Sequence, residues 1–115
     1  MPPRIDSLFA ALPSPEAGED FLTLLRRPGL HIERIVSSPR PASTLYDQDG
    51  DEWVVLLQGE ATLELDGEPL TLRAGDHLLI PAHLPHRVLA TSASPRCIWL
   101  AVHMQPQPAT PDTPS

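Results

Sequence analysis

The sequence predicts an all-β domain that folds as an antiparallel sandwich or barrel. Short runs of aliphatic and β-branched residues recur along most of the chain, and Gly, Pro, Asp and Ser separate them at short intervals. No helical segment lies between these runs, which argues against a parallel sheet with crossover helices. The dipeptide Asp66-Gly67 stands between two alternating runs and favours a tight type I′ hairpin.

Three parts of the chain differ in composition. Within residues 1–29, the stretch 19–27 places apolar residues at helical spacing and a Pro-Gly pair follows it, so we expect a short helical or irregular segment that packs on the barrel. Residues 30–104 hold the strands. Residues 105–115 are rich in Pro and Thr without an apolar anchor, and we expect a disordered tail.

The predicted strands follow one another closely within the barrel. The run 52–57 is nearly unbroken apolar sequence after its first residue, so both of its faces should be covered, whereas 61–65 alternates like a strand with one wet face. The complete set of predicted strands is 30–36, 52–57, 61–65, 69–73, 77–80, 86–90 and 97–103.

Composition narrows the range of functions. A chain of 115 residues has the size of one ordinary domain. Its formal net charge of -7 argues against a nucleic acid or an anionic membrane surface as a partner. The single cysteine, Cys97, cannot form an internal disulfide, and no apolar run approaches the ~20 residues that a membrane span needs. We therefore expect a soluble, cytoplasmic protein.

Two segments resemble motifs of a known family. Glu52 and Gly59 stand at the two ends of one predicted strand, while Pro81 and His86 close a second segment that begins with a Gly-Asp turn. These spacings resemble the second half of the first cupin motif and the second cupin motif. The chain is therefore identified as similar to small single-domain cupins over residues 30–104. The resemblance implies a double-stranded β-helix, a jelly-roll-like barrel that is commonly dimeric and holds a metal or a small ligand.

One part of the family pattern is missing. Cupins that bind a metal usually carry His-x-His a few residues before the glutamate of the first motif. Those places fall here on Leu45 and Asp47, or on Tyr46 and Gln48 in the neighbouring register. Neither register supplies a histidine, so the metal-binding motif is degenerate.

The candidate metal ligands are therefore Glu52, His86 and Asp47. Nitrogen and oxygen donors of this kind suit Mn, Fe, Ni or Zn, and Asp47 or its neighbour Gln48 could add an oxygen from the loop before Glu52. Gln48 is equally a candidate ligand-binding residue. In the alternative interpretation, Glu52 and His86 pair with each other or with buried hydroxyls and need no ion.

Other polar residues are candidates for chemistry or binding. Tyr46 and His83 could move protons at the barrel entrance, although the simpler interpretation is a solvent-facing role for both: Tyr46 caps the core with its hydroxyl in water and His83 lies in an exposed turn. Trp99 and His103 share one face of the last strand and line either the cavity or a dimer surface. The remaining two histidines are expected at the surface or at strand edges: His31 and His77.

Two functions follow from these residues. The first is binding of a small polar ligand in the barrel, with or without a divalent metal; the alternative is a metal-dependent oxygenase, isomerase or lyase that acts on a small organic molecule. The missing histidine pair favours the first, and the retained Glu52 and His86 support the second. If Glu52 points inward, the apolar face with Trp53, Val55 and Leu57 points outward, and we expect a homodimer to cover it.

Overall fold

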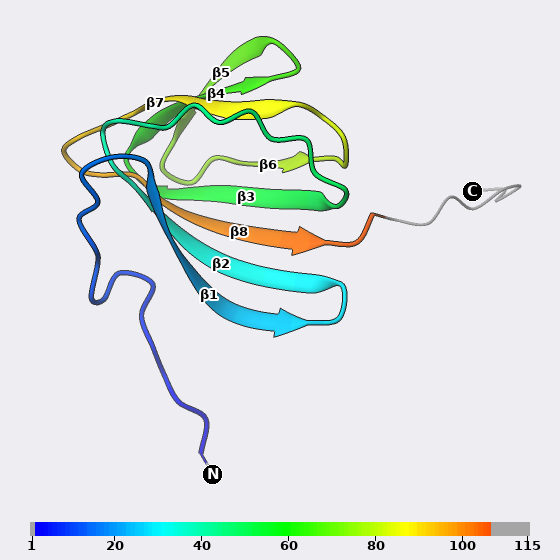
Figure 1. Ribbon diagram of the computed structural model, residues 1–115. Coiled ribbons are helices and arrows are strands. Elements are labelled where there is room, and N and C mark those ends of the chain that lie inside the picture. The colour runs from blue at the N-terminus through cyan, green and yellow to red at the C-terminus, as the bar shows by residue number, and fades with distance from the viewer. Residues whose placement is uncertain (1, 107–115) are drawn as a thin grey trace, which may run out of the picture.

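The computed structural model describes residues 2–106 and consists of two antiparallel sheets that face each other (Figure 1). The larger sheet has the strand order β1-β2-β8-β3-β6 and the smaller one has the order β5-β4-β7. The all-β fold predicted from the sequence is confirmed. The strands are β1 (Glu19–Arg27), β2 (Leu30–Ser37), β3 (Asp51–Gln58), β4 (Glu60–Leu65), β5 (Glu68–Arg73), β6 (His77–Ile80), β7 (His86–Thr91) and β8 (Ile98–Met104).

The core lies between the two sheets. Strand β3 shows how the sequence builds it, because Glu52, Val54 and Leu56 are buried while the residues between them are only half-buried. The strand that reads as continuously apolar therefore still has an inner and an outer face. The buried apolar cluster consists of Ile35, Val54, Leu56, Ala61, Leu63, Leu72, Ile80, Cys97, Trp99 and Ala101.

The helix expected near the N-terminus is wrong, because residues 19–27 form the edge strand β1. Phe21 pairs with Ile35, and a bulge interrupts the register between Thr23 and Leu25. The bulge breaks the alternation of the strand, and the resulting spacing of apolar residues imitates a helix. A nine-residue segment has little helical stability of its own, whereas pairing with β2 satisfies its backbone along one whole edge.

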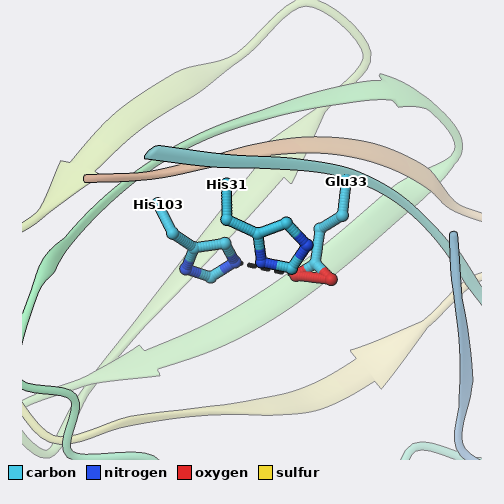
Figure 2. A group of neighbouring side chains, drawn as sticks. All are labelled: His31, Glu33 and His103. Atoms are coloured by element: carbon cyan, nitrogen blue, oxygen red, sulfur yellow. Dashed lines mark hydrogen bonds and ion pairs between the residues drawn. The ribbon is translucent and has the colours of Figure 1, made fainter. Parts of the chain in front are cut away.

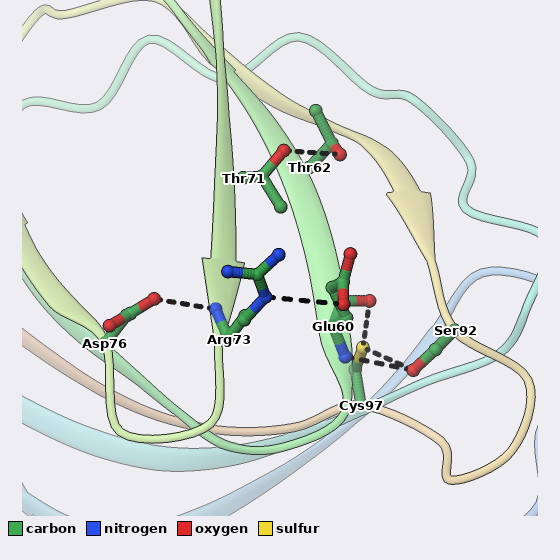
Figure 3. A network of polar contacts seen from close by, with 7 residues as sticks. All are labelled: Glu60, Thr62, Thr71, Arg73, Asp76, Ser92 and Cys97. Carbon is green, nitrogen blue, oxygen red and sulfur yellow. Dashed lines mark hydrogen bonds and ion pairs between the residues drawn. The ribbon is translucent and has the colours of Figure 1, made fainter.

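Glycines with positive φ angles form the turns at the two ends of β4. The predicted hairpin at Asp66-Gly67 joins β4 to β5, and both residues have positive φ angles, 49° and 83°. Between β3 and β4, Gly59 has a φ of 94° and lies against Cys97. Figure 3 shows this corner, where the Glu60 amide donates to Ser92 Oγ at 3.0 Å and the Cys97 thiol donates to the Glu60 carbonyl at 3.2 Å.

Both ends of the described chain are attached to the larger sheet. Arg34 Nη1 donates to the carbonyls of Leu8 and Ala10, so the N-terminal segment contacts the outer face of β2. At the other end, the Gln105 amide donates to the Gly29 carbonyl at 3.1 Å. The tail predicted to be disordered lies, from residue 107 on, outside the described residues. Within residues 2–106, no helix has the length and apolar character to cross a membrane.

Candidate functional site

A cavity of about 230 Å³ lies between the two sheets. Apolar atoms form most of the surface of its wall, and the polar groups come from the inner face of the larger sheet, from the start of β7 and from the segment 46–48. The polar lining residues are Glu19, Glu33, Tyr46, Gln48, Glu52, His86, Arg87 and His103. Trp99 also lines the cavity, so the inner face of β8 is the one that carries Trp99 and His103.

Strand register places several ionisable residues side by side on the larger sheet. Glu52 of β3 pairs with His103 of β8, and His103 pairs in turn with His31 of β2. Paired residues of antiparallel strands have their side chains on the same face. Glu33 follows two positions after His31 and therefore shares this face. We call His31, Glu33, Glu52 and His103 the inner row.

Glu52 and His86 form a contact that bridges the two sheets. His86 Nδ1 lies 2.9 Å from the Leu84 carbonyl and donates to it, so Nε2 faces Glu52 Oε1, at 3.6 Å. Burial lowers the pKa of His86, but the Glu52 carboxylate and the Leu84 carbonyl outweigh this effect, and the pKa lies above its usual value. The Glu52 carboxylate therefore favours the protonated form of His86 inside the cavity.

Glu33 and His103 form a second, closer pair. His103 Nε2 lies 2.7 Å from Glu33 Oε2, and this hydrogen bond raises the pKa of His103 against the opposing effect of burial. The His31 ring stacks on the His103 ring, with centroids 5.5 Å apart (Figure 2). His31 is therefore not an isolated surface histidine, as the sequence analysis expected, but part of a histidine–carboxylate cluster.

A third carboxylate reaches the cavity from the edge strand β1. The Ser37 hydroxyl donates to Glu19 Oε2 at 2.7 Å and accepts from Trp99 Nε1 at 3.0 Å. Burial raises the pKa of Glu19, the Ser37 hydrogen bond partly offsets this, and the nearby carboxylates of Glu52 and Glu33 raise it further. The cavity thus contains three carboxylates whose charges repel one another.

Tyr46 and Gln48 stand at the mouth because residues 46–48 run beside the start of β7. The Tyr46 amide donates to the His86 carbonyl at 2.8 Å, the His86 amide donates back at 3.0 Å, and the Tyr46 ring stacks on the His86 ring. Burial and the nearby carboxylates raise the pKa of Tyr46, so its phenol stays protonated at neutral pH. Tyr46 can therefore donate a hydrogen bond to a molecule at the mouth.

Asp47 and His83 lie outside the cavity lining. Asp47 stands between Tyr46 and Gln48, so alternation turns its carboxylate outward, where it lies 3.0 Å from His83 Nδ1. Both side chains are more than half exposed. The structure therefore does not bring Asp47 to Glu52 and His86, and it places His83 in a rim contact rather than beside the cavity groups.

Three polar residues of this region were not predicted to belong to the site: Glu19, His31 and Glu33. His31 and Glu33 carried a usable signal, since they stand two residues apart on a predicted strand and so share a face with Ile35. Glu19 gave no such signal, because the segment around it had the spacing of a helix.

Metal-free protein is expected to lose stability as the pH rises from about 6 to 8. His86 and His103 have raised pKa values in the folded protein, so their contribution is fully present below the unfolded value of about 6.5 and is lost as the pH rises through the folded values. The raised pKa of Glu19 acts in the same direction, starting above the unfolded value of about 4.5. Melting temperatures measured with a chelator across this range test it.

The variant His103→Gln should flatten this pH dependence. His77→Gln is the matched control, because His77 is an exposed residue on β6 outside the cavity. A melting temperature that stays level or climbs between pH 6 and 8 would contradict the expectation.

The fold and the site together define a class of protein: a small two-sheet barrel with a cavity between its sheets and ionisable groups converging in it. A family model described as the cupin domain matches residues 39–103. The chain belongs to the cupin family. The resemblance seen in the sequence is thereby confirmed.

Solved structures give the same result. A protein from Ralstonia eutropha JMP134, provisionally named a mannose-6-phosphate isomerase, is 43% identical, with a TM-score of 0.77 over 90% of this chain and 99% of that one. A cupin superfamily protein from Desulfitobacterium hafniense DCB-2 is 22% identical, with a TM-score of 0.76 over 91% and 94% of the two chains. The iron(II) form of HppE is 22% identical, with a TM-score of 0.66 over 76% of this chain and 50% of that one. The last two likenesses show the fold alone.

Proposed function

We propose that this cupin binds a small polar molecule without net negative charge in the cavity between its sheets. The observation that carries the proposal is the charge of the wall. Three carboxylates, Glu19, Glu33 and Glu52, face two histidines, His86 and His103. With all three carboxylates ionised and both imidazoles protonated, the net charge is -1; a proton on Glu19, whose pKa burial raises, would bring it to zero, so in neither case is the wall positive.

The available cations do not reverse this balance. All eight basic residues of the chain are arginines, and the one that lines the cavity, Arg87, is held by Glu64 at 2.8 Å. An anionic ligand would therefore enter a site that repels it, whereas hydroxyl, amine or amidine groups would find carboxylate acceptors. The apolar remainder of the wall, with Trp99 in it, suits the carbon face of such a molecule.

The named activity of the Ralstonia relative offers a second candidate, isomerisation of a phosphosugar. The 43% identity favours it, but a phosphate group needs cationic partners, and the described cavity residues that could serve, Arg87, His86 and His103, each already face a carboxylate. Support is also weak for a metal-dependent reaction at the position where cupins usually hold a metal, around Glu52 and His86. Tyr46 and Gln48 stand in one register of the missing histidine pair, so Glu52 and His86 form only half of a usual set of donors.

A matched set of sugars tests the charge preference. We expect metal-free protein to bind mannosamine at least as tightly as mannose and to discriminate against mannose 6-phosphate. Quenching of Trp99 fluorescence in the Trp53→Phe variant gives the affinities, because Trp53 lies on the opposite face of its sheet, next to His77. Tighter binding of the phosphate would contradict the proposal, and quenching by none of the three would exclude sugar-sized ligands.

Two variants locate the binding groups. Glu52→Gln should weaken mannosamine binding roughly ten- to a hundredfold, because a hydrogen bond to a charged group contributes about 1.5–3 kcal/mol. Glu68→Gln, an exposed change on β5, should leave the affinity unaltered. Equal effects of the two substitutions would show that mannosamine does not bind in the cavity.

The expected homodimer and the cytoplasmic location stay predictions. Apolar side chains on β1 support association, since Phe21, Leu22 and Leu24 are each more than two-fifths exposed in the single chain.

A further inference from the structure

We propose that His31, Glu33 and His103 bind a divalent transition-metal ion on the inner face of β2 and β8. One donor atom from each of the three residues can be chosen so that all lie within 4.8 Å of one another. Donors around a tetrahedral zinc ion, at about 2.1 Å each, lie about 3.4 Å from one another. Small side-chain movements therefore suffice to close the site, and Figure 2 shows both rings beside the Glu33 carboxylate.

The scaffold beneath these residues is rigid. His31 and His103 are directly paired across β2 and β8, which are both interior strands of the larger sheet, and Glu33 follows on the same face. This position differs from the one where the family motifs place a metal, around Glu52 and His86. The metal site thus follows from strand register rather than from the degenerate motif.

Contacts behind His31 orient its ring. His31 Nε2 lies 2.9 Å from Thr23 Oγ1, which can accept its proton and leave Nδ1 free to bind an ion. Arg26 Nη2 also approaches Nε2, at 3.3 Å, and can donate to it only when Nε2 carries no proton, so this contact favours the opposite tautomer. Arg26 is exposed on the edge strand β1, so it can move away when an ion binds.

The chemistry of the donors restricts the ion. Two imidazole nitrogens and one carboxylate suit Fe²⁺, Zn²⁺, Ni²⁺ or Mn²⁺ rather than Ca²⁺ or Mg²⁺. Three protein donors leave a coordination position open, and Glu33 and His103 both line the cavity, so that position can face a bound molecule. The inference is independent of the proposed sugar-like ligand, which requires no ion.

Metal titration tests the site. Chelator-treated protein is titrated calorimetrically with Zn²⁺, Ni²⁺, Fe²⁺ and Mn²⁺ alone, and bound metal is counted after dialysis. We expect one ion per chain and a raised melting temperature with at least one of these metals. Failure of all four to bind would overturn the proposal.

Substitutions of the candidate ligands test where the ion binds. His31→Gln and Glu33→Gln should weaken binding more than tenfold, Thr23→Val roughly tenfold through the lost orienting contact, and Arg26→Gln should strengthen it. His77→Gln is the control for an exposed histidine. Loss of binding in Glu52→Gln and His86→Gln, with retention in His31→Gln, would place the ion at Glu52 and His86 and overturn the proposal. Circular dichroism confirms that each variant is folded, and sugar binding by metal-free protein reports separately on the cavity.

Discussion

Gly59→Ala is expected to be one of the most destabilising single changes in this protein, at roughly 2–5 kcal/mol. A Cβ atom at this corner would stand 2.8 Å from Cys97 Sγ and 2.9 Å from Ser92 Oγ, distances that real Cβ atoms do not show. The φ of 94° adds backbone strain for any residue with a side chain. Urea unfolding followed by tryptophan fluorescence gives the loss directly.

Gly67→Ala separates the two causes. Gly67 also has a positive φ, 83°, but nothing lies within 4 Å of the added Cβ, so only the strain of about 1–2 kcal/mol applies. The double variant Gly59→Ala/Cys97→Ala should recover part of the extra loss. If Gly59→Ala and Gly67→Ala were equally destabilising, crowding at the β3–β4 corner would not be a determinant of stability.

Glu33→Leu is expected to destabilise metal-free protein by roughly 2–3 kcal/mol at pH 6. The substitution keeps most of the side-chain volume but leaves His103 without its 2.7 Å partner in a partly buried site. The loss should shrink above pH 8, because the imidazole can then be neutral. Chemical unfolding at the two pH values measures both quantities.

A double-mutant cycle isolates the pair. Glu33→Leu/His103→Leu should cost less than the sum of the two single changes, because it removes both polar partners together. Glu64→Leu provides the comparison: Glu64 is also ion-paired, with Arg87, but that pair is more exposed and should contribute no more than about 1 kcal/mol. Additive single effects would show that Glu33 and His103 are not energetically coupled.

Most of the fold could be predicted from the sequence because local signals agreed with the tertiary structure. The strands β2 to β8 were bounded by turn residues, and the Asp66-Gly67 hairpin has the conformation its dipeptide favours. Strand β1 was missed because a bulge near Leu24 changes the phase of its side chains. The position of such a bulge depends on the partner strand, which a local pattern does not contain.

The candidate site was predictable only in part. The alternation of β3 and β8 was visible, but which face of β8 pointed inward depended on its pairing with β2 and β3. The same pairing brings His31 beside His103 from a position 72 residues earlier in the chain, as their numbers show. Asp47 was placed one residue out of phase, since Tyr46 and Gln48 face the cavity and the residue between them does not.

The position of the inner row within the larger sheet has a consequence for how this protein can diversify. Its four members stand on β2, β3 and β8, three adjacent interior strands whose backbones are held on both sides. Tyr46 and Gln48, by contrast, belong to an irregular segment at the entrance. Substitutions at the entrance can alter which molecules enter the cavity, while the inner row keeps its geometry. The selectivity for ligands can therefore change without a change in the charge of the inner row.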